Sequence, residues 1–297
     1  MRTGLVAPQW DVHAGPLLRA HMEAGRKPVW FSPQGFRFDE RGTLQHDDWT
    51  RGEWSRLSGL VVTSLCGKLD PELFEWRRGL LEELAVAGLP VVPDPRSIQM
   101  AWDPTRMLLR LKRAGVAVID HYVGENLDDA WDFVRTHKGA VFRAPEGSPV
   151  PEVEWVSQGH GTRDRLEELW QTYPMGPFVL VREIRGGITS VLILGDDALA
   201  AWRDGTPGID QTEHVAMPVE TAERDLALAA ARAFGLDPVV IDLARDAKGL
   251  QVHGVRPLGI WKPALATHPQ LARTIVERLE ALITKATKPA RPRPAAS

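Results

Sequence analysis

The amino-acid sequence predicts an α/β protein, with a parallel α/β unit at the N-terminus and an α+β arrangement in the rest of the chain. Three observations support this prediction. Short apolar segments alternate with helical stretches up to residue 95, an order typical of parallel sheets. The run GLVVTSL at Gly59–Leu65 has the length and composition of a strand covered on both faces. Near the C-terminus, two apolar runs joined by Asp-Ala-Lys-Gly predict an antiparallel hairpin at 239–257.

The N-terminal unit alternates strand and helix signals. Its first helix carries Leu17, Leu18 and Met22 on one face. Its second helix begins at Pro71 and ends before Gly88, following the preference for Pro in the first turn and Gly after the last. We expect strands at 4–8, 29–32, 59–65 and 90–94, and helices at 16–25 and 71–88.

The remaining chain divides into two further units and a tail. A stretch rich in Met, Leu and Arg predicts one long helix over Ser97–Ala114. Further strands are expected at 140–145, 154–158, 178–184, 188–195, 198–203 and 214–219, with helices at 127–136, 163–172, 221–234 and 268–285. We therefore divide the chain into an N-terminal unit at 1–95, a central α+β unit at 96–175, a C-terminal unit at 176–285 and a disordered, basic, Pro-rich tail at 286–297.

Composition excludes several classes of protein. The 36 Lys and Arg residues against 39 Asp and Glu residues give a net charge of −3, without the basic excess of nucleic-acid or membrane-surface proteins. A hydrophobic fraction of 43% excludes wholesale disorder. The single cysteine, Cys66, cannot form an internal disulfide, and Asp11 and His13 interrupt any signal-peptide core. No apolar run approaches the roughly 20 residues of a membrane span, so we expect a cytoplasmic protein.

Short site motifs are missing from the sequence. It contains no GxGxxG after the first strand, no Walker A motif, no GxSxG elbow and no HExxH spacing. Single motifs therefore identify no dinucleotide, P-loop, serine-hydrolase or zinc-protease site. The information lies in the order of longer segments.

From about Leu65 to Pro257 the chain resembles the ATP-grasp ligases, and within them the RimK-type branch. That branch includes the ribosomal-protein glutamate ligases and the amino-group-carrier ligases of lysine biosynthesis. The resemblance rests on four segments in the family's order: AGLPVVPDPRSIQMAWDPTRMLLRLKRAGVAV, GAVFRAPEGS, FVLVREIRGGITSVLILGDDALAAWR and the stretch 221–256 with its GLD turn. It implies an ATP-grasp fold behind an N-terminal parallel α/β domain. It also implies ATP and Mg²⁺ as cofactors in forming an acyl phosphate that an amine attacks.

The resemblance also assigns phosphate-binding positions. The Lys of the family's Asp-Lys pair falls on Pro104, beside Asp103, and Arg106 two residues later is its nearest cationic substitute. The Lys of the next strand falls on Arg143, whose planar guanidinium suits phosphate. The Gly-rich flap is reduced to Gly147, Ser148 and Pro149, a weak cradle because Pro lacks an N–H.

Further positions follow from the same resemblance. The hinge that lines adenine falls on Arg182 and Glu183. The family's Asp-x-Arg falls on Ile188 and Ser190, so its Arg is missing, and the catalytic Arg after the next hairpin is matched by Arg203.

The metal site departs most from the family pattern. Asp242 matches the first acidic ligand, but the final Glu-x-Asn pair falls on Gly254 and Arg256. This exchange removes two Mg²⁺ ligands and adds a cation, which at about 6 Å and an effective dielectric near 20 repels a divalent ion by several kcal/mol. Asp242 is then either a metal ligand, held with water and phosphate, or the partner of a cation such as Arg245 or Arg256.

The arginines allow two interpretations. Arg143, Arg182, Arg203 and Arg256 either form one anion pocket, in which guanidinium groups replace part of the work of Mg²⁺, or are separate surface and salt-bridge residues. His253 is expected to point away from Gly254 and Arg256 by strand alternation, and His160 to lie in a solvated loop.

Two functions follow. In the first, the chain is a degenerate ATP-grasp protein that weakly binds a nucleotide, another small anionic ligand or a protein partner without ligating. In the second, it is an active, divergent ATP-dependent carboxylate–amine ligase of the glutamate type, with a carboxylate substrate. An unrelated α/β binding domain is a third interpretation. We expect no nucleic-acid or membrane partner, and the sequence leaves homo-oligomers open.

Overall fold

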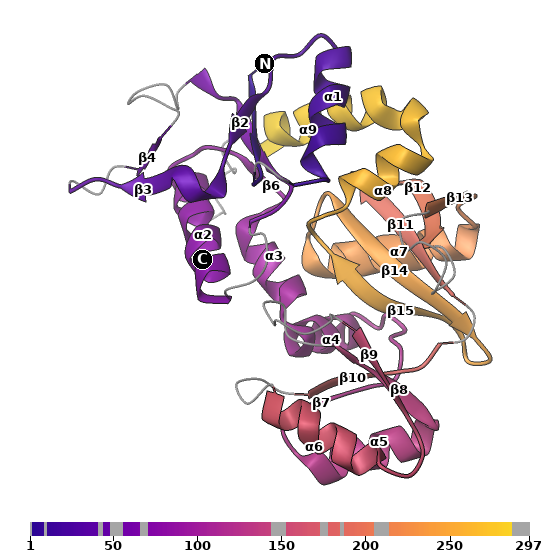
Figure 1. The fold of residues 1–297 in the computed structure, drawn as a ribbon. Coiled ribbons are helices and arrows are strands. Elements are labelled where there is room, and N and C mark those ends of the chain that lie inside the picture. The colour runs from indigo at the N-terminus through magenta and orange to yellow at the C-terminus, as the bar shows by residue number, and fades with distance from the viewer. Residues whose placement is uncertain are drawn as a thin grey trace, which may run out of the picture.

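A computed structural model gives the fold of the chain (Figure 1). It describes residues 2–8, 11–40, 44–47, 56–65, 71–143, 153–172, 178–184, 187–204 and 214–286. Cys66, the flap residues Gly147, Ser148 and Pro149, and tail residues 287–297 lie outside this part of the chain.

The N-terminal unit is built on a parallel sheet with strand order β2-β1-β5-β6, as the alternating pattern predicts. Every residue of β1 and β5 is buried, which explains their apolar sequences. The elements of this unit are β1 (Thr3–Val6), α1 (Ala14–Glu23), β2 (Val29–Phe31), the small hairpin β3 (Phe36–Phe38) and β4 (Leu44–His46), β5 (Gly59–Val62), α2 (Pro71–Val86) and β6 (Val91–Val92).

The strand order creates a switch point in this sheet. From β1 the chain moves to β2 on one side, and it later returns to β5 on the other side. In parallel α/β sheets, a crevice forms at the carboxyl ends of the two strands where the order reverses. Here the switch point lies after Val6 and Val62.

The predicted long helix at Ser97–Ala114 is two helices, α3 (Pro95–Trp102) and α4 (Pro104–Arg113). Asp103 separates them because a residue before Pro avoids helical backbone angles, and its ψ is 113°. Its Oδ1 atom accepts hydrogen bonds from the backbone N–H groups of Thr105 and Arg106, at 2.9 and 3.1 Å. Asp103 thus caps α4, with Pro104 in the first turn.

The central unit is an antiparallel sheet with strand order β7-β10-β8-β9. Ala130 and Val134 of α5 and Leu166 and Leu169 of α6 pack with Phe142 of the sheet. The elements are β7 (His121–Gly124), α5 (Leu127–His137), β8 (Gly139–Arg143), β9 (Val153–Ser157), α6 (Thr162–Thr172) and β10 (Phe178–Arg182).

The C-terminal unit is an antiparallel sheet with strand order β13-β12-β11-β14-β15, which includes the predicted hairpin. Helix α7 packs against Val191 and Ile241 on one face, and α8 packs against Leu192 and Trp202 on the other. The elements are β11 (Ile188–Leu194), β12 (Asp197–Asp204), β13 (His214–Met217), α7 (Thr221–Phe234), β14 (Val239–Asp246), β15 (Gly249–Arg256), α8 (Trp261–Thr267) and α9 (Ala272–Ala286).

Two elements cross the unit boundaries drawn from sequence. Strand β10, assigned to the unit at 176–285, pairs with β7 and β8 of the central sheet. Helix α9, assigned to the same unit, packs against α1, β5 and β6 and so covers the N-terminal sheet (Figure 1). The positions of β10 and α9 both depend on tertiary packing, which the linear order of segments in the sequence does not reveal. Among the described helices, none has the length and hydrophobicity that crossing a bilayer demands.

Candidate functional site

Asp242 lies in the middle of the C-terminal sheet. Strand β14 pairs it with Ser190 of β11 on one side and with Gly254 of β15 on the other. Directly paired residues share a face of a sheet, so these three positions form one row. The Asp242 side chain is only 13% exposed.

Arg256 holds the Asp242 carboxylate with both sides of its guanidinium group. Its Nε atom donates to Asp242 Oδ2 at 2.8 Å, and its Nη2 atom donates to Oδ1 at 2.7 Å. Ser190 Oγ also donates to Oδ1 at 2.7 Å and accepts a hydrogen bond from Arg256 Nη2 at 2.8 Å. The three side chains form a closed, bidentate network, the strong form of a carboxylate–arginine pair.

The network keeps Asp242 ionised. Burial by itself raises the pKa of this carboxyl group, but the charge and hydrogen bonds of Arg256, with the Ser190 hydroxyl, outweigh burial and hold the pKa below its usual value. The protein thus contains a buried carboxylate whose charge is balanced by a guanidinium group from its own sheet.

This arrangement does not fit a Mg²⁺ site. Mg²⁺ needs oxygen ligands in near-octahedral geometry, whereas both oxygens of Asp242 already accept hydrogen bonds from Arg256 and Ser190. Among the described side chains, no three His, Cys, Asp or Glu residues lie together so that they could hold a metal. Of the two roles left open for Asp242, the structure gives it that of ion-pair partner.

His253 departs from the expected strand alternation. Asp242 pairs with Gly254, whereas Leu243 pairs with Val252, so His253 is the extra residue of a β-bulge. The side chain is buried, with 8% exposed, and its charge is among the influences that lower the pKa of Asp242. The bulge therefore brings His253 within electrostatic reach of the carboxylate. Sequence alternation alone gave no sign of this bulge.

Arg203 does not join the Asp242 network. It pairs with Thr189, while its neighbour Trp202 pairs with Ser190. Successive residues of a strand point to opposite faces, so Arg203 lies on the face opposite Ser190 and Asp242. Its Nη2 atom is 3.5 Å from Thr189 Oγ1.

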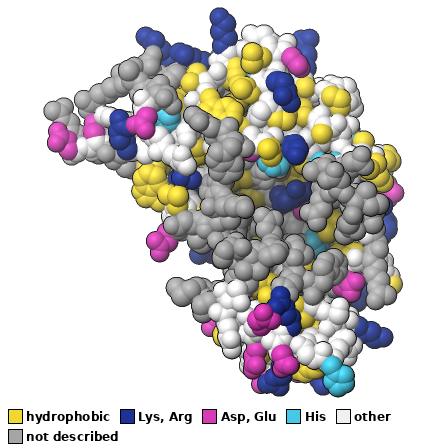
Figure 2. All heavy atoms as spheres, in the orientation of Figure 1, with side chains coloured by type: hydrophobic (Ala, Val, Ile, Leu, Met, Phe, Trp, Pro, Cys, Tyr) yellow, Lys and Arg dark blue, Asp and Glu magenta, His cyan; other side chains and the backbone are white. Residues whose placement is uncertain are grey.

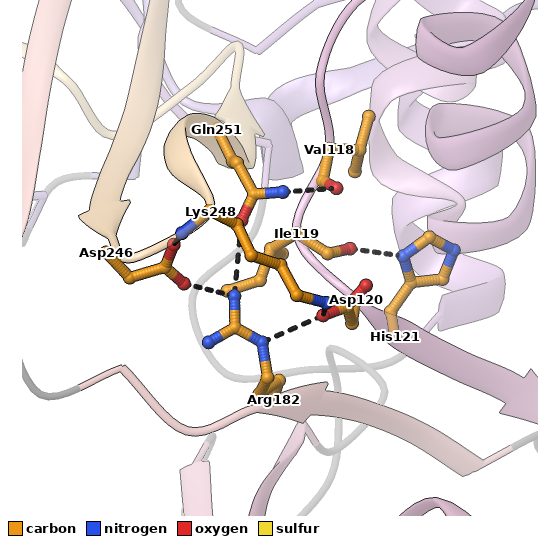
Figure 3. Close-up of polar contacts among 8 residues, drawn as sticks. All are labelled: Val118, Ile119, Asp120, His121, Arg182, Asp246, Lys248 and Gln251. Carbon is orange, nitrogen blue, oxygen red and sulfur yellow. Dashed lines mark hydrogen bonds and ion pairs between the residues drawn. The ribbon is translucent and has the colours of Figure 1, made fainter. Parts of the chain in front are cut away.

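Arg182 lies in a second network, where the central sheet meets the β14–β15 hairpin (Figure 3). Its Nε atom donates to Asp120 Oδ2 at 3.0 Å, and its Nη2 atom bonds to Asp246 and, at 3.2 Å, to Gln251 Oε1. Lys248 Nζ donates to the same Asp120 oxygen at 2.6 Å. Only 15% of the Arg182 side chain is exposed. The guanidinium predicted to lie at an adenine edge is thus committed to two acids.

Both acids of this second network are held ionised. For Asp120, burial raises the pKa, but hydrogen bonding and charge from Lys248 and then Arg182 outweigh burial and lower the pKa below its usual value. For Asp246, the bond from Arg182 and the Lys248 backbone N–H likewise outweigh burial and lower the pKa. Because Asp120 precedes β7 and Asp246 ends β14, these bonds join the central and C-terminal units.

The other predicted positions are dispersed. Arg106 forms an ion pair with Asp103, with Nε and Oδ2 3.3 Å apart, and its side chain is 57% exposed. Glu183 lies just after β10. Its Oε2 atom is close to Gly139, since a Cβ atom added to that glycine would lie only 3.2 Å from it. Arg143 ends β8 opposite Val179, and its side chain is outside the described atoms. His160 is exposed, as expected for a loop residue.

Sequence reasoning missed Ser190 as a partner of Asp242. The signal was present, because an arginine is lost at Ser190 and another gained at Arg256, two positions in contact across the sheet. Ser190 lies on β11 and Arg256 on β15, the two strands that flank β14, so their contact follows only once the register is known. No sequence signal pointed to the second network, whose other members are Asp120, Asp246 and Lys248. Its contacts form only where the central and C-terminal units pack together.

Comparison with known proteins shows what this chain is similar to. No protein-family model matches the chain. The probable alpha-L-glutamate ligase of Stenotrophomonas maltophilia strain K279a is 26% identical over 234 residues, which span 74% of this chain and 80% of the relative.

Solved structures agree on the fold. The RimK domain ATP-grasp protein of Sphaerobacter thermophilus matches 93% of this chain and 98% of its own, with a TM-score of 0.71 and 16% identity. The ATP-grasp ligase PsnB, complexed with its minimal precursor, matches 94% and 98%, with a TM-score of 0.71 and 18% identity. The resemblance read from segment order is thereby confirmed. The chain has the ATP-grasp fold.

Proposed function

We propose that this protein uses the ATP-grasp fold to bind a nucleotide or another small anionic ligand weakly and without a Mg²⁺ cage, and that it does not ligate that ligand. The main support is the commitment of both Asp242 oxygens to Arg256 and Ser190. A carboxylate engaged in this way is not available to a divalent cation.

The charge of the site also supports an anionic ligand. Arg256 is 36% exposed, so its guanidinium group is bound to Asp242 on one side and still reaches the surface. Guanidinium groups bind phosphate and carboxylate through paired N–H donors. An anion that meets Arg256 gains this attraction without first displacing a metal.

Calorimetric titration with ATP, in excess Mg²⁺ and in EDTA, tests the proposal. We expect weak binding whose dissociation constant differs by less than about threefold between the two conditions. The variant Arg256→Asn frees the Asp242 carboxylate and returns an amide to the position, so Mg²⁺ should strengthen ATP binding to it by about tenfold. Tight, strictly Mg²⁺-dependent binding by the wild-type protein contradicts the proposal.

A second candidate function is an active α-L-glutamate ligase. It is favoured by the relative named above, which this chain matches over 80% of that relative's length. Release of ADP that requires both glutamate and an amine acceptor would support it. In the degenerate interpretation, ADP release stays at the level of a protein-free control.

A further inference from the structure

We propose that helix α9 is an acid-sensitive link between the N-terminal and C-terminal units, and that protonation of His21 detaches α9 from α1. The inference goes beyond the proposed function, because none of its residues belongs to the Asp242 network. It requires no bound ligand, so it can be tested on the free protein.

Helix α9 packs on both units. It contacts α1, β5 and β6 of the N-terminal unit and β11 of the C-terminal sheet (Figure 1). Leu279 of α9 shares one apolar core cluster with Val61 of β5 and Leu192 of β11. On the C-terminal side, Arg278 Nη1 donates to the Leu194 carbonyl at 3.1 Å. A change that detaches α9 from α1 therefore weakens the connection between the two sheets.

His21 is a buried residue of α1 that lacks a polar partner. It lies one helical turn after Leu17, which packs in the same core cluster as Leu279 of α9. The surface over α1 and α9 in Figure 2 carries apolar and charged side chains, and His21 lies beneath it with 0% of its surface exposed. Neither ring nitrogen has a hydrogen-bond partner in the described part of the chain. Protonation would turn this ring into a buried charge with two unsatisfied N–H donors, which is far more costly than the neutral ring.

The charges around His21 provide no counter-ion for the protonated ring. Among the described residues, the charges that act on it are those of Glu280 on α9 and Arg26 just after α1, and none comes from α8 or the sheet. Both Glu280 carboxylate oxygens already accept hydrogen bonds from Arg26, at 2.7 and 2.9 Å. Burial lowers the pKa of His21 to about 4, because it outweighs the attraction of Glu280, which Arg26 also opposes.

Two polar atoms of the sheet beneath these helices do not bond to His21 either. Thr3 lies two residues before Leu5, and Trp30 pairs with Leu5, so all three share the side of the sheet that α1 and α9 cover. Thr3 Oγ1 and Trp30 Nε1 are buried and have no hydrogen-bond partner among the described residues. The contact between the helices and the sheet thus fits a neutral imidazole.

The sign of the pH effect follows from the two pKa values of His21. Its pKa is about 4 in the packed protein and returns to the ordinary value of about 6.5 when α9 moves away. The neutral ring therefore favours the packed state fully above pH 6.5, and this preference is lost as the pH falls from 6.5 towards 4. The population of the detached state should rise by about twentyfold between pH 7 and pH 5. Ordinary carboxyl groups titrate mostly below this range, with pKa values of about 4.

Hydrogen exchange of the full-length protein, followed by mass spectrometry, measures that rise. Protection factors compare each exchange rate with the intrinsic rate at the same pH, and are obtained for peptides covering α1, α9 and, as the internal reference, α5. We expect protection of α1 and α9 to fall by about twentyfold from pH 7 to pH 5, and that of α5 by less than about twofold. Unchanged protection of α9, or an equal loss in α5, overturns the inference without any variant.

Variants assign the effect to His21. His21→Gln and His21→Leu cannot take up a proton in this range, so protection of α9 should no longer depend on pH between 7 and 5. The two substitutions differ in polarity, and a thermal unfolding midpoint at pH 7 shows which variant is folded. The matched control His160→Asn changes an exposed histidine and should keep the pH dependence of the wild type. A pH dependence that persists in a folded His21 variant overturns the inference.

Discussion

Two arginine networks lie in the C-terminal half of this protein, and they differ in what they connect. Arg256 pairs with one acid, Asp242, inside a single sheet. Arg182 pairs with two acids, Asp120 and Asp246, across the junction of two units (Figure 3). The chemistry is the same, but the first network engages the carboxylate that the resemblance matches to a metal ligand, and the second connects one unit to another.

In the function proposed here, the fold has given up the metal-binding role of one site and kept its shape. The Asp242 network satisfies a buried carboxylate that a cation would otherwise have to balance, so the sheet needs no metal. The Arg182 network is independent of that change, since it shares no residue with it. Each can therefore be altered alone.

The largest expected effect is loss of stability in Arg256→Leu. This change leaves Asp242 buried without its counter-ion, which should cost about 3 kcal/mol of unfolding free energy, measured by urea denaturation. The double variant Asp242→Leu with Arg256→Leu should recover much of that loss, because no unpaired charge remains. A loss below about 0.5 kcal/mol in the single variant would mean that the pair contributes as little as an exposed one.

A smaller loss is expected for Arg182→Leu, about 2 kcal/mol, because Asp120 keeps its bond to Lys248. The joint should also loosen, so exchange of the Ile119 amide proton, which bonds to the Val252 carbonyl, should accelerate. Arg135→Leu is the matched control, since its arginine pairs at the surface with Asp132 and is 60% exposed. Equal effects of Arg182→Leu and Arg135→Leu would mean that the Arg182 network contributes no more than a surface ion pair.

A pH-dependent effect should follow from the same carboxylates. The pKa values of Asp120 and Asp246 are lowered in the folded protein, so their stabilisation is present above the ordinary Asp pKa of about 4 and is lost as pH falls through the lowered values. Urea unfolding between pH 7 and pH 3 should therefore show a smaller decline in Asp120→Asn with Asp246→Asn than in the wild type. An unchanged decline would place the acid sensitivity elsewhere, with Asp242 the next group to test.

The smallest effect is expected for Arg106→Gln. Its guanidinium is 57% exposed and pairs with the Asp103 cap of its own helix, so stability should change by less than about 0.5 kcal/mol. Binding of ATP should also stay unchanged. Weakened ATP binding in this variant would return Arg106 to the anion site that the sequence suggested for it.

Much of the fold could be predicted because local patterns agree with the tertiary structure. Buried strands such as Gly59–Val62, the Pro71 helix start and the hairpin around residues 246–249 all have sequence signals that tertiary packing respects. The helix break at Asp103 could have been read from Pro104, since a residue before Pro avoids the helical region.

The site was less predictable because it depends on register and on contacts between units. The prediction of one cleft for four arginines relied on strand positions alone, and pleating sends Arg203 to the other face from Asp242. A one-residue bulge at His253 changed the environment of the carboxylate.

The most direct test of the central claim is whether the wild-type protein holds a divalent cation at Asp242. Mn²⁺ can be titrated into the protein in the presence and absence of ATP, and free Mn²⁺ followed by electron paramagnetic resonance. Because Arg256 and Ser190 occupy the carboxylate, we expect no more Mn²⁺ bound than ATP alone binds. One tightly bound Mn²⁺ per protein, lost in Asp242→Asn, would contradict the account.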